Sequence, residues 1–357
     1  MSVPDSVPGS VPVLSPPGVV LRAAALYVPE TEVTSADLGQ RLGLSAAEIV
    51  RRTGVRTRRW APPQHATSTL GTRAAQALFK ETGVDPAGVD RILVSTTSPD
   101  MAFPATACLI QQALGISSEG GAMDVFASCT GFLAALSMAR AAILTGEARR
   151  ILVISADVKS RFLDLDDPAT AILFGDGAGA ALIEADPHGT LSGGRVGPVT
   201  LRTDGSRWHY VHMPAGGSRL PLSADTLAAG QHTLKMDGIP LFRMAVSRFS
   251  EIIRATLERD GLGVNDIACF VFHQANLRIL EAVAGRLGIP EGRVCTTLER
   301  YGNTSSASLP ITLATALSEG RIGDGDNVLL ATFGGGLTWG ACRLRWQGTG
   351  AGHPPHR

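Results

Sequence analysis

Residues 123–144 read MDVFASCTGFLAALSMARAAIL, and this stretch carries the strongest structural signal in the chain. A strand-like run leads to Cys129, and an almost wholly apolar helical run begins at Gly131. A helix that is apolar all round is buried. The thiol therefore lies at the N-terminus of a buried helix, where unpaired N–H groups and the helix dipole stabilise a thiolate. A cysteine in an apolar run is also commonly a small core residue, so this segment alone leaves both roles open.

Short apolar runs rich in β-branched residues alternate with longer helical patterns along the rest of the chain. This alternation predicts an α/β fold with a buried sheet. The predicted strands are Arg91–Ser95, Arg150–Ser155, Ala268–Phe272 and Asn327–Thr332. The predicted helices are 72–82, 105–114, 131–145, 241–260, 277–287 and 308–319. Four of them are followed by a glycine that we expect to act as a C-terminal cap, namely Gly146, Gly261, Gly288 and Gly320.

The two halves of the chain repeat one pattern. The first half has a strand, the helix opened by Cys129, another strand, and FGDGAGAALIEA from Phe174. The second has a strand ending at His273, a helix opened by Gly-Asn303-Thr, another strand, and FGGGLTWGACRLRW from Phe333. The first half has the longer insert, because Cys129 and Phe174 are 45 positions apart but Asn303 and Phe333 only 30. We predict a duplicated fold with halves at 19–190 and 191–346.

Composition excludes several classes of function. Lys+Arg and Asp+Glu number 32 each, so bulk charge gives no support for a nucleic-acid partner. No uncharged apolar stretch is long enough to span a membrane. Residues 1–18 are rich in Pro and Ser, which predicts a disordered leader rather than a signal peptide, and 347–357 predict a flexible tail. The five cysteines have no zinc spacing, so we expect no metal site and reduced thiols in a cytoplasmic protein.

Three further features are weak individually. His273 ends an apolar strand, where it serves either as a base or donor or as a structural histidine. Asn303 lies in a polar turn before a helix, where an ordinary N-cap is the competing role. The glycines at 334–336 allow close backbone approach. Together with Cys129 they indicate a thiol-transfer site. A papain-like protease is excluded, because its Cys signature and disulfide framework are absent.

Several motifs together resemble the β-ketoacyl-acyl-carrier-protein synthase III family, over roughly residues 19–346. They are RRTGVRTRRW at 51–60, AFPATACLIQ at 102–111, DVFASCTGF at 124–132, FGDGAGAAL at 174–182, HQANLRI at 273–279, YGNTSSAS at 301–308 and FGGGLTWG at 333–340. The resemblance implies an α/β thiolase-like fold, with duplicated mixed-sheet halves in five layers (αβαβα).

The implied reaction is a decarboxylative Claisen condensation by a ketosynthase. Cys129 would take an acyl group from a thioester, and the N–H groups of Cys129 and Gly335 would form the oxyanion hole. His273 and Asn303 would donate hydrogen bonds to the carbonyl of a malonyl- or β-ketoacyl-type carrier thioester. We expect no cofactor and no metal, because the substrates carry phosphopantetheine or coenzyme A and loss of CO₂ drives the reaction.

The resemblance also implies substrate and partner contacts. Arg52, Asn276 and Phe333 would contact the substrate, and Arg243 and Arg278 would dock an acyl carrier protein. The chain would form a homodimer in which Phe103 reaches the neighbour's acyl pocket.

One position departs from the family. Glu48 replaces a tryptophan that commonly stacks on the adenine of coenzyme A. A carboxylate cannot stack and repels phosphates, so we expect a carrier-bound acyl donor and a role in polyketide or secondary-metabolite biosynthesis. The chain would prime such a pathway or join two carrier-bound chains.

Three alternatives stay open at this point. The first is housekeeping fatty-acid initiation from an acyl-coenzyme A. The second is an acyltransferase of the same fold that moves the acyl group from Cys129 to an alcohol or amine. The third is a non-catalytic interaction subunit, against which the intact Cys129, His273 and Asn303 argue.

Overall fold

The computed structural model describes residues 18–117 and 119–348. Of the leader predicted at 1–18 and the tail predicted at 347–357, residues 1–17 and 349–357 lie outside the described ranges. Gly18 and Gln347, which we assigned to the leader and the tail, instead begin strand β1 (Gly18–Tyr27) and end strand β15 (Thr338–Gln347). Both residues pair with neighbouring strands, Gly18 with Asp186 and Gln347 with Gly193. Backbone pairing therefore extends to these two positions in spite of their polar, turn-prone surroundings.

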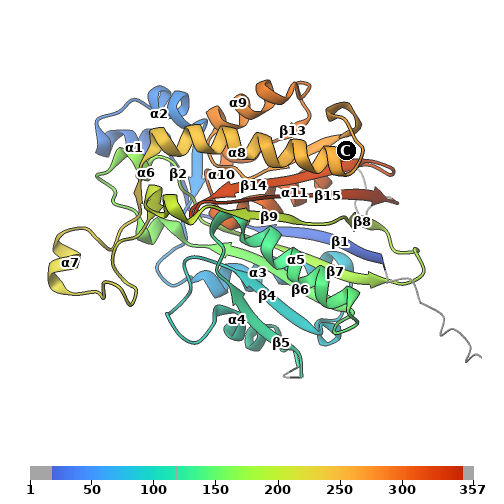
Figure 1. The fold of residues 1–357 in the computed structure, drawn as a ribbon. Helices are drawn as coiled ribbons and strands as arrows, with labels where there is room; N and C mark the ends of the chain where they lie inside the picture. Colours follow the sequence, from blue (N-terminus) through green and yellow to red (C-terminus); the bar gives the residue numbers. More distant parts are fainter. Residues whose placement is uncertain (1–17, 118, 349–357) are drawn as a thin grey trace, which may run out of the picture.

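The strands form one long mixed ladder whose two ends repeat each other. Its order is β13-β12-β14-β15-β8-β1-β7-β6-β4-β5, and β9 also pairs with β15 (Figure 1). In the first half these are β4 (Arg91–Ser95), β5 (Gly121–Val125), β6 (Arg150–Asp157) and β7 (Gly177–Asp186). In the second half they are β12 (Cys269–Phe272), β13 (Val294–Cys295), β14 (Asn327–Gly334) and β15, with β8 (Gly193–Val196) and β9 (Thr200–Thr203) between the halves.

Strand directions confirm the predicted duplication. In the first half β4 pairs in parallel with β5 and β6, and β6 pairs antiparallel with β7. In the second half β12 pairs in parallel with β13 and β14, and β14 pairs antiparallel with β15. The longer insert of the first half lies between β6 and β7, where the second half has only a tight turn between β14 and β15. The ladder is continuous because β8 pairs with both β15 and β1.

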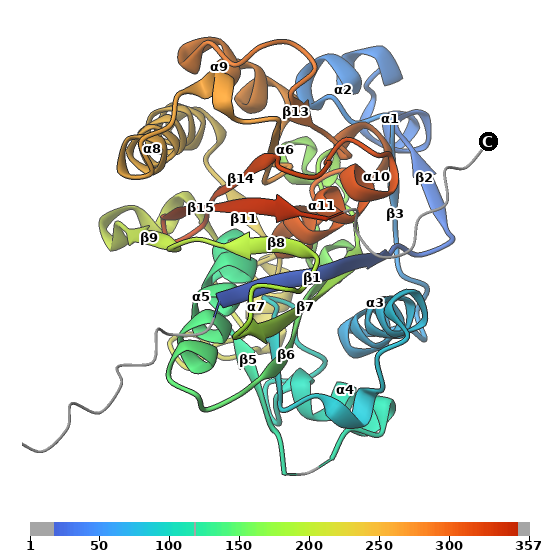
Figure 2. The same cartoon turned by 90° about the vertical axis from the view of Figure 1, so that its right-hand side faces the viewer.

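Helices complete five layers. Helices α5 (Gly131–Leu144) and α11 (Ser308–Ser318) lie between the two halves of the sheet. Almost the whole of α11 is buried, and α5 is buried except on a narrow face that carries Met138 and Ala141. Helices α3 (Thr67–Thr82) and α4 (Thr106–Leu114) cover the outer face of the first half, and α8 (Gly238–Arg259) and α9 (Leu277–Leu287) that of the second (Figure 2). The apolar surface of α5 that the sequence predicts thus packs against strands of both halves of the sheet.

Alternation along the strands assigns side chains to the layers. On β6, Ile151 and Val153 pack against the central helices, whereas Leu152 and Ile154 pack against α3 and α4. Each strand is therefore apolar on both faces because each face meets a helical layer. The same arrangement holds on β14. The predicted strands were confirmed within two residues at each end, and the four capping glycines have φ between 65° and 78°.

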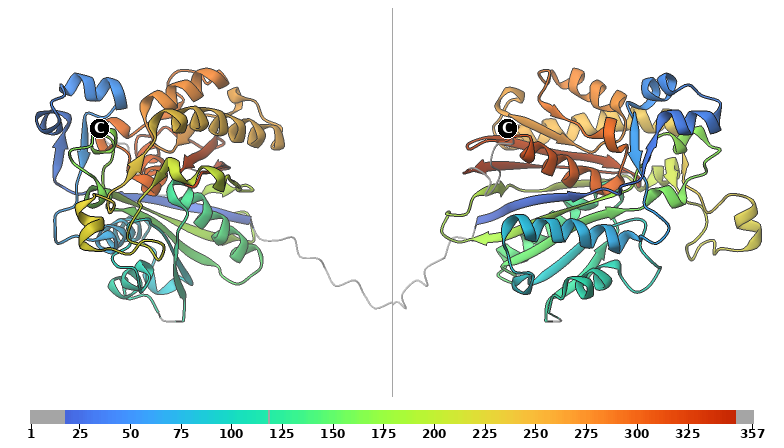
Figure 3. Two further views of the ribbon diagram at one scale, coloured as in Figure 1. Left: turned by 60° about the vertical axis from the view of Figure 1, so that its left-hand side comes forward. Right: turned by 180° about the vertical axis from the view of Figure 1, so that it is seen from behind.

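The remaining elements are short and lie at the edges. They are β2 (Glu32–Thr34), α1 (Ser35–Leu42), α2 (Ala46–Thr53), β3 (Thr57–Arg59), α6 (Pro168–Ala171), β10 (Val211–His212), α7 (Ala224–Ala228), β11 (Lys235–Met236) and α10 (Leu298–Tyr301). The segment around α7 projects from the body of the molecule (Figure 3). No helix in the described ranges is long and apolar enough to cross a membrane.

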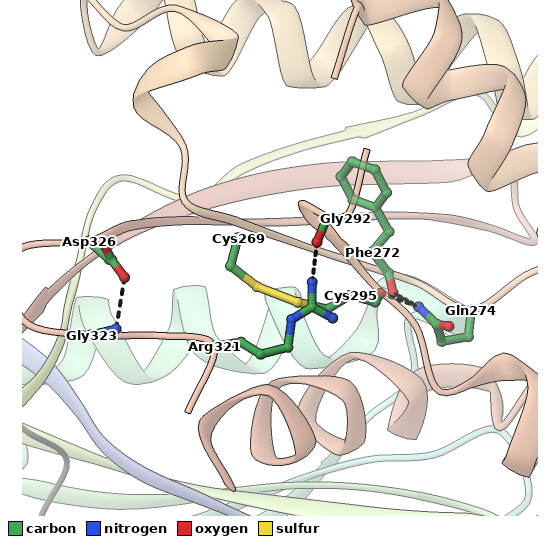
Figure 4. Close-up of a disulfide and its surroundings, with 8 residues drawn as sticks. All are labelled: Cys269, Phe272, Gln274, Gly292, Cys295, Arg321, Gly323 and Asp326. Carbon is green, nitrogen blue, oxygen red and sulfur yellow. Dashed lines mark hydrogen bonds between the residues drawn. A yellow bond between two sulfur atoms is a disulfide. The ribbon is translucent and has the colours of Figure 1, made fainter. Parts of the chain in front are cut away.

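One expectation about the cysteines was wrong. The structure joins Cys269 to Cys295 by a disulfide between the neighbouring strands β12 and β13 (Figure 4), and only Cys108, Cys129 and Cys342 are free among the described residues. The Cα atoms of Cys269 and Cys295 are 6.6 Å apart, although 26 positions separate the two residues in the chain. Parallel pairing places Val271 opposite Cys295, which brings the two thiols within reach. Sequence spacing alone cannot reveal such a register.

Candidate active site

Cys129 lies in the tight turn that connects β5 to α5. The turn is a single 3₁₀ unit, Ser128–Thr130, and Ser128 has φ = 51°, a left-handed value that is strained for a residue other than glycine. The Thr332 hydroxyl donates to the Cys129 carbonyl at 2.9 Å, which ties this turn to β14 of the other half. Cys129 is half-buried and lines a cavity. The predicted position of the thiol at the start of a buried helix is confirmed.

The glycine run after Phe333 lies directly against this cysteine. A Cβ atom added to Gly334 would lie 2.5 Å from Cys129 Cβ and 2.9 Å from its Sγ, so no larger residue fits there. The Gly335 backbone N–H is close enough to form a hydrogen bond with the Cys129 sulfur. The backbone at 334 passes so close to Cys129 that only glycine fits there. This close approach also places the Gly335 N–H, which we expect to be an oxyanion donor, beside the thiol.

The thiol of Cys129 is protonated at rest. Burial raises its pKa to about 11, and the nearby Asp157 carboxylate adds to this effect. The Lys159 ammonium, the Ser305 side chain and the Gly335 N–H act in the opposite direction but do not compensate. A thiolate stabilised at neutral pH, as expected from the helix N-terminus alone, is therefore not the resting state. The burial that disfavours the thiolate depends on the fold and could not be read from the local sequence.

His273 follows the last residue of β12 and is 2 % exposed. Its Nδ1 lies 2.6 Å from Ser308 Oγ, and this oxygen accepts a hydrogen bond from the Gln274 N–H at 3.2 Å. Burial lowers the pKa of His273 to about 4, although the Ser305 backbone and the Asp157 charge favour protonation. The imidazole is consequently neutral at physiological pH, with its ring orientation held by Ser308.

Asn303 is positioned by backbone pairing with Phe174, which lies in the longer insert between β6 and β7 of the first half. It forms a parallel bridge with Phe174, in which its N–H donates to Leu173 O at 2.9 Å and its carbonyl accepts from Gly175 N at 3.1 Å. Its side-chain Oδ1 accepts from Ser305 N at 2.8 Å, and Nδ2 donates weakly to Ala275 O at 3.4 Å. With Oδ1 so engaged, the Nδ2 group is the end of the amide left to face the cavity.

One cavity of about 190 Å³ brings these groups together. Its polar lining includes Cys129, His273, Asn303, Gly335 and Asn276. The rest is mostly apolar, with the side chains of Leu173, Phe174, Val211, Leu234, Met236, Leu241, Phe242, Ala245, Ile279 and Phe333. An apolar cavity with a few convergent polar groups is typical of a small-molecule site. The three residues predicted as catalytic thus share a site, as do the predicted contacts Asn276 and Phe333.

The other predicted substrate and partner residues lie outside the cavity lining. Arg52 is paired with Glu48 one helical turn before it, on α2. Asn276 Nδ2 donates to the Arg52 carbonyl at 3.1 Å, and its Oδ1 caps α9 by accepting from Arg278 N at 2.9 Å. Phe103 is 87 % exposed. Arg243 on α8 and Arg278 on α9 are exposed, and neither forms an ion pair with any described residue.

Sequence reasoning assigned no role to four polar side chains in the cavity wall, namely Ser128 and Ser305, which lie in the quoted motifs, and Thr97 and Lys159. Thr97 follows β4, and Lys159 follows the end of β6 with only 10 % of its side chain exposed. Neither belongs to a motif that points to a site, so their convergence depends on the fold. Within the described ranges, no group of three or more His, Cys, Asp or Glu side chains is arranged to hold a metal ion.

Two family models match the chain. The model for 3-oxoacyl-[acyl-carrier-protein] synthase III matches residues 123–205, and the model for its C-terminal part matches residues 257–346. A relative from Symbiobacterium thermophilum, named beta-ketoacyl-[acyl-carrier-protein] synthase III, is 41 % identical over 330 residues, which is 92 % of this chain and 98 % of the relative. The chain belongs to the synthase III family. It is accordingly a condensing acyltransferase with a thiolase fold.

Solved structures agree with this assignment. The synthase III of Pseudomonas aeruginosa has a TM-score of 0.85 at 34 % identity, over 94 % of this synthase and all of that chain. The priming β-ketosynthase of the R1128 polyketide pathway has a TM-score of 0.85 at 33 % identity, and the match covers 96 % of this synthase and 100 % of that chain. OleA from Xanthomonas campestris is 20 % identical with a TM-score of 0.81, which shows a shared fold alone.

Proposed function

We propose that this synthase condenses an acyl group held on Cys129 with a malonyl-type thioester of an acyl carrier protein, with loss of CO₂. The observation that carries the proposal is the single cavity in which the Cys129 thiol, the neutral His273 imidazole and the Asn303 amide converge. A neutral imidazole and an amide are suited to donate hydrogen bonds to a developing enolate, because neither requires a charge to be buried.

The proposed reaction balances in two steps. The Cys129 sulfur attacks the donor thioester, its proton leaves with the departing thiol, and the N–H groups of Cys129 and Gly335 stabilise the oxyanion. The extender then loses CO₂, and the electron pair of the broken C–C bond forms an enolate stabilised by His273 and Asn303. The enolate carbon attacks the acyl carbonyl, the C–S bond to Cys129 breaks, and the released thiolate takes a proton from solvent to restore the thiol. No cofactor or metal is needed, because the thioester and the released CO₂ supply the driving force.

The proposal is tested by two measurements on the full chain. Intact-mass spectrometry should show one acyl adduct that maps to Cys129, and a malonyl carrier thioester should then release CO₂ in step with product. Acylation without CO₂ release, followed by transfer to an alcohol or amine, would favour the alternative acyltransferase. An adduct on Cys108 or Cys342 would contradict the assignment of the nucleophile.

We further infer that the acyl donor is bound to a carrier protein and that the pathway is a polyketide or secondary-metabolite pathway. Glu48 supports this, because its carboxylate neutralises Arg52 at the expected substrate entrance and would repel the phosphates of coenzyme A. Exposed, unpaired Arg243 and Arg278 are suited to an acidic carrier protein.

Loading rates from matched acyl-coenzyme A and acyl-carrier donors test this choice of donor. Loss of an aromatic stack costs about 1–3 kcal/mol, roughly ten- to a hundredfold in affinity. Glu48→Trp should therefore raise loading from coenzyme A and leave carrier loading unchanged. Glu48→Gln, which only frees Arg52, is the matched control and should have a smaller effect. Equal loading of the parent from both donors would contradict the inference.

We also propose a homodimer in the cytoplasm. β5 is the last strand of the ladder, and exposed apolar side chains lie on or near it and on α5, namely Met101, Phe103, Met123, Phe126 and Met138. Apolar surface of this kind marks protein interfaces. Light scattering should give twice the 37.2 kDa chain mass. In the dimer, Phe103→Ala should alter acyl-chain preference more than stability, and a stable monomer would exclude this arrangement.

A further inference from the structure

A lysine forms part of the cavity wall beside the thiol. Among the described residues that line the cavity, Lys159 is the only Lys, Arg, Asp or Glu. Its side chain is 10 % exposed, and its charge lowers the pKa of the Cys129 thiol, so the ammonium lies close to the reacting sulfur. Most other side chains of the wall are apolar. A cation in such a wall has to be paired and hydrogen-bonded.

The protein satisfies this ammonium only in part. Lys159 Nζ lies 3.1 Å from Asp157 Oδ1 and donates to the Thr97 hydroxyl. An ammonium has three N–H donors, and the described residues provide no third acceptor. One N–H donor of the ammonium therefore remains for a group that enters the cavity.

The partner carboxylate is itself strongly held. Asp157 is completely buried and accepts hydrogen bonds from Thr97 N at 2.9 Å, Ser98 Oγ at 3.0 Å and Ser306 Oγ at 2.9 Å. These donors and Lys159 lower its pKa against the effect of burial. Asp157 is thus fixed as an anion, and it in turn fixes the position of Lys159.

We propose that Lys159 is a specificity residue that selects an acyl group with a neutral oxygen, a hydroxyl or a keto group, on one of the first carbons beyond the thioester carbonyl. This inference rests on the proposed acylation of Cys129. A purely aliphatic chain would displace the solvent and leave an ammonium N–H unpaired, whereas a neutral oxygen accepts its hydrogen bond. A carboxylate would fit less well, because Asp157 lies 3.1 Å from the same nitrogen.

A competition experiment isolates this preference. Full-length enzyme receives equal amounts of butyryl- and 3-hydroxybutyryl-pantetheine, and intact-mass spectrometry gives the ratio of the two Cys129 adducts. A second competition uses 3-oxobutyryl-pantetheine. The parent should favour the oxygenated chain by about tenfold or more, since rejection of a group that leaves a buried donor unpaired is strong. The ratio within one tube is independent of the folded fraction of a variant.

Three variants of the Lys159 site and one control variant complete the test. Lys159→Met should abolish or invert the ratio, and Lys159→Arg should keep it. Lys159→Met combined with Asp157→Asn should behave like Lys159→Met, and it avoids leaving a buried carboxylate unpaired. Lys235→Met is the matched control, because Lys235 lies outside the cavity lining and pairs with Asp164 at 4.0 Å.

The outcomes separate this inference from the proposed function. Equal butyryl and 3-hydroxybutyryl adducts in the parent, or an unchanged ratio in Lys159→Met, would overturn the role of Lys159 while acylation of Cys129 still stood. Absence of any adduct on Cys129 with all three donors and with carrier-bound donors would overturn the proposed function and this inference together.

Discussion

The two halves of the synthase contain the same tight turn at the start of a buried helix. In the first half, Ser128–Thr130 leads into α5, and in the second half Ser305–Ala307 leads into α11. Ser128 and Ser305 have φ of 51° and 55° and are the only described non-glycine residues with positive φ. The middle residues of the two turns are Cys129 and Ser306. One lines the cavity, and the other is completely buried.

The same backbone unit therefore performs two different tasks. Cys129 presents a thiol to the cavity, whereas Ser306 Oγ donates to the buried Asp157 of the first half at 2.9 Å. The second half supplies its chemistry from other positions, at the end of β12 and in the turn before α11, where His273 and Asn303 lie. Duplication provided two equivalent turns, and the burial of each decides whether its side chain is available to a substrate.

The largest effect is expected from the nucleophile. Cys129→Ala should lose acyl transfer entirely, because no other described thiol lines the cavity. The double variant Cys129→Ala/Ser306→Cys adds a thiol to the equivalent turn of the second half. It should stay inactive, since position 306 is buried against Asp157. An acyl adduct on the new cysteine, found by peptide mapping, would contradict the distinction between the turns.

The next largest effect is expected from the two polar residues of the second half, which should serve decarboxylation more than acylation. His273→Ala and Asn303→Ala should retain partial self-acylation but lose decarboxylation by about 10²–10³-fold, as expected for loss of one donor to a developing oxyanion. Adduct mass and CO₂ release, measured on the same samples, check this. A variant that loses acylation and decarboxylation equally would indicate that the second half also serves the first step.

The pH dependence should differ between the steps. Because the pKa of the Cys129 thiol is about 11, its thiolate fraction falls about tenfold for each pH unit below that value. Acylation should therefore decrease about a hundredfold from pH 8 to pH 6. With a pKa of about 4, His273 stays neutral over this range, so decarboxylation by pre-acylated enzyme should change less than twofold. Rapid-quench measurements at each pH test both rates. If acylation and decarboxylation depended on pH in the same way, the predicted difference between the two steps would be refuted.

Ser306→Ala should affect stability rather than chemistry. It removes one donor from a completely buried carboxylate, which costs about 1–3 kcal/mol of the free energy of unfolding. Denaturant titration measures the loss, and the acylation rate per folded molecule should stay within about twofold of the parent. Ser218→Ala is the control, because Ser218 is exposed in a turn and its hydroxyl forms no hydrogen bond with any described residue. An unchanged stability would show that Ser306 does not hold the halves together.

The smallest effect on activity concerns the disulfide. The second half joins β12 to β13 through Cys269 and Cys295, whereas the equivalent strands β4 and β5 of the first half are joined by backbone pairing alone. Thiol titration of the denatured, unreduced protein should give three thiols, rising to five after reduction. The variant Cys269→Ser should keep its turnover within about twofold. Five thiols before reduction would contradict the disulfide.

The sequence by itself determined the alternation of helices and strands in this synthase and pointed to three residues that converge in its cavity. Helices that are apolar all round, such as α5, have to lie between two sheets, and strands apolar on both faces have to meet a helix on each side. These local patterns predicted an α/β fold and four strands, each within two residues of its observed ends, whereas the five-layered thiolase-like arrangement was implied by the family resemblance. Cys129, His273 and Asn303 could be predicted because each lies in a long motif at the end of a regular element.

Only the tertiary structure decided what surrounds these groups. The high pKa of Cys129 and the low pKa of His273 follow from burial, which no local pattern of residues specifies. The Cys269–Cys295 pair depends on strand register, and the Glu48–Arg52 ion pair on the rotamers of two side chains one helical turn apart. Lys159 and Thr97 come from separate strand ends that meet only in the folded sheet. Contacts between distant segments depend on the whole fold, and for that physical reason the sequence alone did not reveal them.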